Sequence, residues 1–129
     1  MKKNHLTILA YSLFTVTVSS QVVASQCDLV KGEKIYTKCA ACHSLAPDKS
    51  LMGPSLHGVF DRKAGALKGF KFSQAMANSN IQWTESDLDE FLLKPAQKVP
   101  GTTMPFSGLR NPKSRAAVLC YIKNKTNSE

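Results

Sequence analysis

Two cysteines with two residues between them, followed at once by a histidine, constrain this chain more than any other feature of its sequence. The segment is Cys39-Ala40-Ala41-Cys42-His43, and this C-x-x-C-H pattern is typical of haem attachment. At the end of a helix, each of two thiols at this spacing can add to one vinyl group of a haem as a thioether. The next residue then places an imidazole beneath the iron. The motif therefore predicts one haem c, attached covalently through Cys39 and Cys42, with His43 as an iron ligand.

Two other interpretations of the same cysteines are less favoured. A zinc site would need two further ligands, which would have to come from Cys27, Cys120 or His57, and these residues show no paired spacing. A thioredoxin-like dithiol belongs to a βαβ unit with a strand before the motif, and no such strand is predicted here. Haem attachment remains the favoured prediction.

The first 25 residues have the pattern of a secretory signal peptide. Lys2 and Lys3 precede an apolar stretch at 6–18, and small residues then offer a processing site. A retained membrane anchor is the competing interpretation, although the apolar stretch is shorter than the roughly 20 residues of a spanning helix. We expect a signal peptide at 1–25, a single domain at 26–129 and a periplasmic location for the soluble, processed protein.

The charge of the chain is basic. Its 17 Lys and Arg residues against nine Asp and Glu give a formal net charge of +8, and removal of the segment with Lys2 and Lys3 lowers this by two. A basic surface favours an acidic partner protein, an anionic membrane surface or nucleic acid. Export and the lack of a nucleic-acid motif argue against nucleic acid, which leaves acidic partner proteins and transient association with a membrane surface.

The chain is predicted to be all-α, with three main helices separated by long loops. Thr84 is a suitable N-cap, and Pro95 would end the helix that begins there. Asn111 and Pro112 suit the start of the last helix. No stretch alternates like a strand. The predicted helices cover 28–40, 84–94 and 111–125, with a short one near 73–77, and loops rich in Gly and Pro cover 53–69 and 95–112. Loops of this length need a large buried group to organise them, as a haem would.

The second axial ligand of the iron separates a carrier from an enzyme. A haem closed by methionine exchanges electrons, whereas an open position binds or activates small molecules. The candidates are Met52, Met76 and Met104. Met52 follows His43 too closely to reach the opposite face with ease, whereas Met104 lies in a proline-stiffened loop far along the chain. Met104 is favoured on this reasoning, and the other two remain open as core residues or ligands.

Several segments in one order resemble those of the mitochondrial-type cytochrome c family, which includes soluble bacterial relatives. The matching segments are 32–36 with 39–43, 53–60, 62–65, 69–70, 81–83, Pro95, 100–104 and 115–123. The resemblance covers nearly the whole processed chain and implies the small cytochrome c fold, wrapped around a single haem.

The resemblance also implies roles for individual residues. His43 and Met104 would be the axial ligands, and the Pro54 carbonyl would accept a hydrogen bond from His43. Gly32 and Tyr36 would lie where the first helix crosses the last, near Val118 and Tyr121. Three residues would hold the haem propionates: Arg62, Trp83 and Thr102.

The implied function is that of a one-electron carrier between respiratory or photosynthetic membrane complexes, and not that of an enzyme. Its partners would be proteins with acidic docking patches, such as a quinol–cytochrome c reductase and a terminal oxidase, and the carrier would be a monomer. The alternative is a haem-c enzyme or a sensor of gases or other small molecules, with the distal position open.

The chain departs from the family pattern in two places. Phe72, Phe91 and Met76 stand where Tyr, Tyr and Asn are common, which predicts a drier environment behind Met104 and a shifted reduction potential. Lysines common around the haem edge are replaced by Ala96, Gln97 and Thr103, so the docking cations would be Lys38, Lys98 and Arg110, with Lys49, Lys63 and Lys113 further out.

The remaining cysteines, Cys27 and Cys120, lie before the first helix and on the last. These helices meet in the implied fold, so an oxidising compartment allows a disulfide between them. Two free thiols fit the sequence equally well, because the required geometry cannot be obtained from sequence alone.

Overall fold

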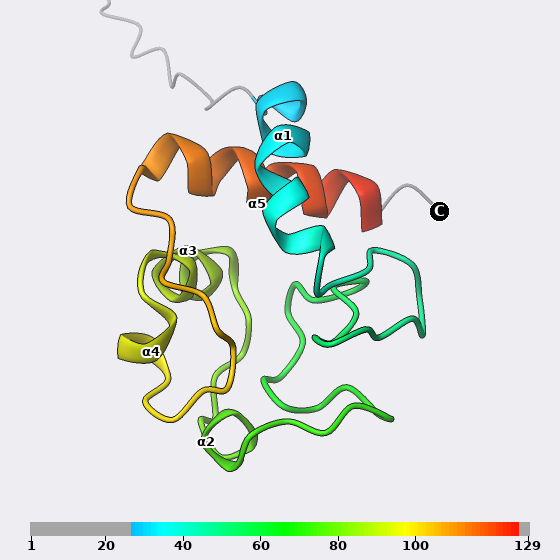
Figure 1. Cartoon of the computed structure of the whole chain (residues 1–129), viewed down its shortest axis with the longest axis vertical. Helices are drawn as coiled ribbons and strands as arrows, with labels where there is room; N and C mark the ends of the chain where they lie inside the picture. Colours follow the sequence, from blue (N-terminus) through cyan, green and yellow to red (C-terminus); the bar gives the residue numbers. More distant parts are fainter. Residues whose placement is uncertain (1–26, 127–129) are drawn as a thin grey trace, which may run out of the picture.

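The structure, a computed structural model, describes residues 27–126, and the expected signal peptide at 1–25 lies outside them. Figure 1 shows α1 and α5 at one end of the molecule, the 41–70 segment on one side, and α3, α4 and the 99–111 loop on the other. The helices are α1 (Leu29–Ala40), α2 (Gln74–Ala77), α3 (Glu85–Leu93), α4 (Pro95–Lys98) and α5 (Pro112–Thr126). Over the described range, β structure is limited to two isolated bridges, His43 with Ser50 and Lys63 with Gln82, so the all-α prediction is confirmed.

The predicted helix starts are correct because the capping residues act locally. The Asp28 carboxylate accepts a hydrogen bond from the Lys31 N–H at 2.9 Å. The Thr84 hydroxyl accepts one from the Asp87 N–H at 3.1 Å. At α5 the Asn111 side chain accepts from the Lys113 N–H at 2.9 Å. Each side chain satisfies a backbone donor that the first turn of a helix leaves unpaired.

The prediction of a loop over 95–112 is wrong at its start. Pro95 follows α3, as expected, but it also begins the single turn of α4. Proline suits the first position of a helix, because its fixed φ is already helical and no N–H is required there. The Val99 N–H bonds to the Pro95 carbonyl at 2.9 Å and ends the turn.

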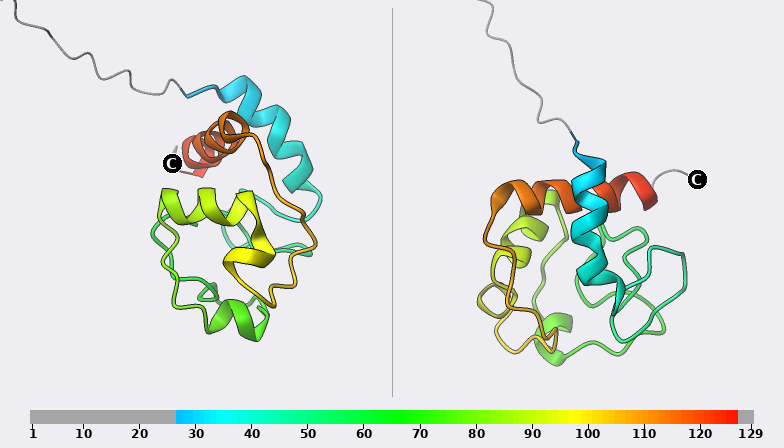
Figure 2. Two further views of the ribbon diagram at one scale, coloured as in Figure 1. Left: turned by 90° about the vertical axis from the view of Figure 1, so that its left-hand side faces the viewer. Right: turned by 45° about the horizontal axis from the view of Figure 1, so that its top comes forward.

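Helices α1 and α5 cross at close range (Figure 2). Gly32 is buried at this crossing, where an added Cβ would lie 2.6 Å from the Tyr121 Cβ and would overlap the Ala117 carbonyl. The rings of Tyr36 and Tyr121 pack beside it with centroids 5.5 Å apart. The placement of Gly32 and Tyr36 at this crossing is therefore confirmed.

A disulfide joins the two helices that cross. Cys27, just before α1, is bonded to Cys120 on α5, with a Cα–Cα distance of 5.8 Å and a sequence separation of 93. That distance is usual for a disulfide. Of the two alternatives that the sequence left open, the structure shows the bonded pair.

The hydrophobic core lies between α5 and α3 and extends to the loops below them. It includes Val118, Leu119 and Ile122 from α5, and Leu88 and Phe91 from α3. None of the helices within 27–126 is long and apolar enough to cross a membrane.

Candidate cofactor site

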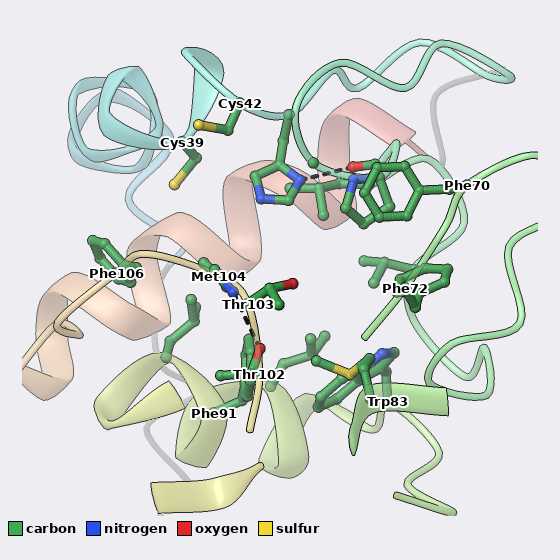
Figure 3. Close-up of a pocket in the computed structure, with 18 of the residues that line it drawn as sticks. Cys39, Cys42, Phe70, Phe72, Trp83, Phe91, Thr102, Thr103, Met104 and Phe106 are labelled. Carbon is green, nitrogen blue, oxygen red and sulfur yellow. Dashed lines mark hydrogen bonds between the residues drawn. The ribbon is translucent and has the colours of Figure 1, made fainter. Parts of the chain in front are cut away.

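The end of α1 presents the two thiols of the attachment motif. The helix ends at Ala40, and the Cys42 and His43 N–H groups both bond to the Cys39 carbonyl, at 3.0 and 2.8 Å. Both thiols are free and half-buried, and Figure 3 shows them on the α1 side of a pocket. Burial raises the pKa of the Cys39 thiol, and the nearby Cys42 adds to this effect. One helical turn therefore places two thiols at the edge of the same pocket.

The His43 imidazole is held by contacts on several sides. Its Nδ1 lies 2.7 Å from the Pro54 carbonyl, so Nδ1 carries the proton and donates it. The Tyr36 hydroxyl donates to the His43 carbonyl at 2.8 Å. Burial lowers the pKa of the imidazole, and the hydrogen bond to Pro54 opposes this in part. A neutral ring that donates from Nδ1 leaves the lone pair of Nε2 available to a metal.

Gly53 is needed because the His43 ring lies directly against it. A Cβ at Gly53 would come within 2.7 Å of Nδ1 of the ring. The Gly53 N–H also bonds to the Cys42 carbonyl at 2.8 Å. This hydrogen bond connects the 50–54 turn to the attachment motif and keeps Gly53 packed against the imidazole.

The loop after α4 brings Met104 to the same pocket. The Thr102 N–H bonds to the Val99 carbonyl at 3.0 Å, and Gly101 has a φ of +91° that favours glycine. The Thr102 hydroxyl then accepts from the Met104 N–H at 3.3 Å. Met104 is half-buried at the pocket and close to Thr102 and Thr103 in Figure 3.

The eight residues predicted to bind the cofactor all line this one pocket: Cys39, Cys42, His43, Pro54, Arg62, Trp83, Thr102 and Met104. The remaining lining is mostly apolar and comes from the end of α1, the loops that follow it, α2, α3, the loop after α4 and α5. The sequence predicted no role in the cofactor pocket for four further lining residues: Leu56, Val59, Leu88 and Leu92. Leu88 and Leu92 are four residues apart on α3, and this helical spacing is the signal that could have identified them.

Two of the predicted residues have a structural role as well. The Arg62 guanidinium donates to the carbonyls of His57 at 2.9 Å and Ser55 at 3.0 Å, and burial lowers its pKa. Trp83 is buried with its ring 5.1 Å from that of Phe91. Arg62 thus places a fixed positive charge at the pocket wall.

The expected ring of docking cations needs two corrections. Lys98 is engaged with α3, since its ammonium lies 2.9 Å from the Asp87 carboxylate and 2.6 Å from that of Glu90. Lys63, expected to lie further out, lines the pocket together with Lys38. The sequence could not show either feature, because both depend on how loops fold back on the helices.

The residues present fit a covalently bound haem and do not fit zinc. Two thiols at the pocket edge, a neutral imidazole, a methionine and apolar walls match a large flat macrocycle, and Arg62 matches its carboxylates. The zinc alternative required Cys27 or Cys120 as additional ligands, but these two residues are bonded to each other.

The fold and the site together define a small c-type cytochrome, a helical domain in which the residues of the attachment motif line an apolar pocket. Comparison with known proteins supports this assignment to the c-type cytochromes. The cytochrome c family model matches residues 29–126, and the chain belongs to this family.

Individual relatives are similar over most of their length. Cytochrome c2 of Blastochloris viridis is 38% identical over 116 residues, which cover 89% of this chain and 91% of that protein. Cytochrome c of Nigella damascena is 42% identical over 101 residues, covering 77% and 91% of the two chains. The solved structure of cytochrome cH from Methylobacterium extorquens superposes with a TM-score of 0.71 at 40% identity, covering 75% of this chain and 98% of that one. The cofactor of this chain is therefore a covalently bound haem c, and the chain is a c-type cytochrome that carries electrons.

Proposed function

We propose that this protein is a soluble periplasmic carrier that moves single electrons between membrane complexes, and that it is not an enzyme. The observation that carries the proposal is the convergence of His43 and Met104 on one apolar pocket. A site with a ligand on each side leaves no position for a substrate, which favours electron transfer over small-molecule chemistry. The bound haem supplies an iron that takes up and gives back one electron.

The residues of this chain would hold that group in a fixed environment. Cys39 and Cys42 would bind it covalently, so that it cannot escape outside the cytoplasm. His43 would bind through Nε2, because Nδ1 is occupied by the hydrogen bond to Pro54. Met104 would bind from the other face. A site closed on both sides changes little between redox states, which keeps electron transfer fast.

The pocket walls would control water and charge. The apolar lining excludes water, and Phe91 and Met76 are both buried there. Arg62, Trp83 and Thr102 would face the propionates, whose burial requires charged or polar partners. Because Phe72 and Phe91 bring no hydroxyl and Met76 brings no amide, we propose that the reduction potential differs from that of relatives with polar groups at these positions.

A visible spectrum tests the closed site. The oxidised protein should show the weak band at the red end of the spectrum that marks methionine on ferric iron, and Met104→Ala should abolish it. If the band were missing at neutral pH, the open-site alternative, an enzyme or a gas sensor, would be favoured instead. If Met52→Ala or Met76→Ala abolished the band while Met104→Ala kept it, the ligand assignment would be wrong.

We propose that the partners are a quinol–cytochrome c reductase and a terminal oxidase, each with an acidic docking patch. The carrier itself is proposed to be a monomer. Electron transfer to membranes that contain these complexes should slow as ionic strength rises, because salt screens attraction between opposite charges. Rates that are independent of salt would argue against charge-steered docking.

Mass spectrometry of the exported protein would test cleavage after residue 25 and the mass of one haem.

A further inference from the structure

Lys98 lies at the end of α4, directly before the loop that carries Met104, and its ammonium pairs with two carboxylates of α3. We propose that Lys98 is a positioning residue for Met104. The Lys98 cluster, formed by Lys98, Asp87 and Glu90, anchors the start of the loop and thereby determines how firmly Met104 is held in the pocket. The inference rests on the proposed closed site and adds a residue that keeps the site closed.

The Lys98 cluster is built around a carboxylate that is already fixed. The Lys98 ammonium lies 2.9 Å from the Asp87 carboxylate and 2.6 Å from that of Glu90. The other oxygen of Asp87 accepts from the Thr84 hydroxyl at 2.6 Å. Exposed ion pairs are often worth little, because two long side chains must be held in one geometry. Here the Lys98 side chain is only 23% exposed and has two acceptors, which favours the upper end of that range.

A short series of contacts leads from Lys98 to Met104. Helix α4 packs against α3 and continues directly into the loop (Figure 1). Val99, the next residue, is 2% exposed, and its carbonyl accepts from the Thr102 N–H at 3.0 Å. The Thr102 hydroxyl in turn accepts from the Met104 N–H at 3.3 Å. The place where Lys98 holds α4 therefore decides where the loop presents Met104.

The far end of the loop is anchored on the same helix. The Leu109 N–H bonds to the Leu92 carbonyl of α3 at 2.7 Å. Arg115 donates both to the Leu109 carbonyl and to the Asp89 carboxylate of α3, each at 2.8 Å. Helix α3 thus holds the loop at both ends, and the Lys98 cluster is the anchor at the start.

The middle of the loop is held by local hydrogen bonds. Over the described residues, the N–H groups of Met104 and Phe106 bond within the loop, to the Thr102 hydroxyl and to the Met104 carbonyl. A segment fixed at both ends gains little conformational entropy when it leaves the pocket. Release of Lys98 lengthens the free segment and increases that gain. Loss of the Lys98 cluster therefore shifts the loop toward an open state in which Met104 is withdrawn.

The test uses imidazole, a small ligand that binds ferric haem in place of Met104. Its apparent affinity increases with the fraction of molecules in which the loop is open. Lys98→Met removes the charge and keeps an unbranched side chain, whereas Lys98→Arg keeps the charge. Lys123→Met is the matched control, because the Lys123–Glu85 pair also ends on α3 but comes from α5. Imidazole is titrated into each oxidised, haem-loaded protein at neutral pH, with loss of the methionine band as the signal. Unfolding by guanidinium chloride is measured in parallel.

Lys98→Met should bind imidazole about threefold to fivefold more tightly than the wild type, and Lys98→Arg and Lys123→Met should stay within about 1.5-fold. A merely structural contact would lower the unfolding midpoint without changing this affinity, as is expected for Lys123→Met. The inference would be overturned by an unchanged affinity in Lys98→Met, by the same rise in Lys123→Met, or by a full rise in Lys98→Arg.

Met104→Ala gives the affinity of the fully open site. A wild type that bound imidazole as tightly as Met104→Ala would refute the proposed closed site, and the inference with it. That result is distinct from a weakly binding wild type with an unaffected Lys98→Met, which would refute the role of Lys98 alone.

Discussion

Arg115 on α5 donates two hydrogen bonds to Asp89 on α3, from Nε at 2.8 Å and from Nη2 at 3.1 Å. Its third nitrogen, Nη1, donates to the carbonyls of Leu109 at 2.8 Å and Arg110 at 3.0 Å. The residue is only 7% exposed. One buried guanidinium thus connects both helices to the segment that returns from Met104.

Replacing this guanidinium should be costly. Arg115→Gln removes the charge and leaves the Asp89 carboxylate and two backbone carbonyls without their donor, so the free energy of unfolding should fall by about 2–3 kcal/mol. Lys123→Gln is the matched control, because Lys123 is also on α5 and its pair with Glu85 of α3 is exposed and 3.2 Å long. That variant should lose less than about 1 kcal/mol. Guanidinium chloride unfolding measures both changes, and similar losses would contradict the role assigned to Arg115.

Gly32 should tolerate no side chain. Gly32→Ala places a Cβ against the backbone of α5, which must move, and we expect a loss of about 2–3 kcal/mol in the free energy of unfolding. This loss would occur even though alanine is a better helix former than glycine. Lys34→Ala, an exposed change on the same helix, should stay within about 0.5 kcal/mol. A more stable Gly32→Ala protein would show that α1 and α5 do not approach this closely.

The Cys27–Cys120 disulfide should stabilise the fold without being needed for the cofactor. Because it joins residues 93 positions apart, the double variant Cys27→Ala, Cys120→Ala should lose about 2–4 kcal/mol. The double change also leaves no unpaired thiol to bond with Cys39 or Cys42. The yield of haem-loaded protein and its spectrum should stay near those of the wild type, and the unfolding midpoint should fall. An unchanged midpoint in oxidised samples would argue against the bond.

The features that sequence predicted correctly are those with local causes. Thr84 and Asn111 cap their helices with their own side chains, and Pro95 ends α3 by its own covalent structure. The attachment motif and His43 occupy consecutive positions at the end of one helix. Such features depend on neighbours within a few residues, so they can be read without knowledge of the fold.

The features that sequence missed depend on distant parts of the chain. The pairing of Lys98 with Asp87 and Glu90 needs α4 to fold back on α3, and α4 itself is a single turn with no periodicity to reveal it. Lys63 reaches the pocket only because the 53–69 loop is wrapped around it. The disulfide between Cys27 and Cys120 likewise depends on the crossing of α1 and α5, which the sequence alone does not show.

The Lys98 cluster should make stability depend on pH in the acid range. Hydrogen bonds from the Thr84 hydroxyl and then from Lys98 lower the pKa of Asp87 below its ordinary value of 3.8. The ionised carboxylate therefore stabilises the fold fully above that value, and this stabilisation is lost as the pH falls through the lowered pKa. Asp87→Asn should have a lower denaturation midpoint than the wild type at about pH 6, and the difference should shrink as the pH falls below 3.8. A difference between the two midpoints that stayed constant as the pH fell would contradict this contribution of Asp87.

The contact between Gly53 and the His43 ring should decide whether the cofactor site forms. Gly53→Ala introduces a Cβ into the space of the imidazole, which must turn away from the Pro54 carbonyl and lose its fixed orientation. Since supporting contacts of this kind are worth about 10–100-fold in metal affinity, we expect a mixture of ligation states in the visible spectrum and a displaced reduction potential. Gly58→Ala separates this effect from backbone strain, because Gly58 has a φ of +59° but nothing within 4 Å of an added Cβ. That variant should lose about 1–2 kcal/mol of stability while its spectrum stays that of the wild type. If Gly53→Ala kept a wild-type spectrum and potential, the imidazole would not depend on this support.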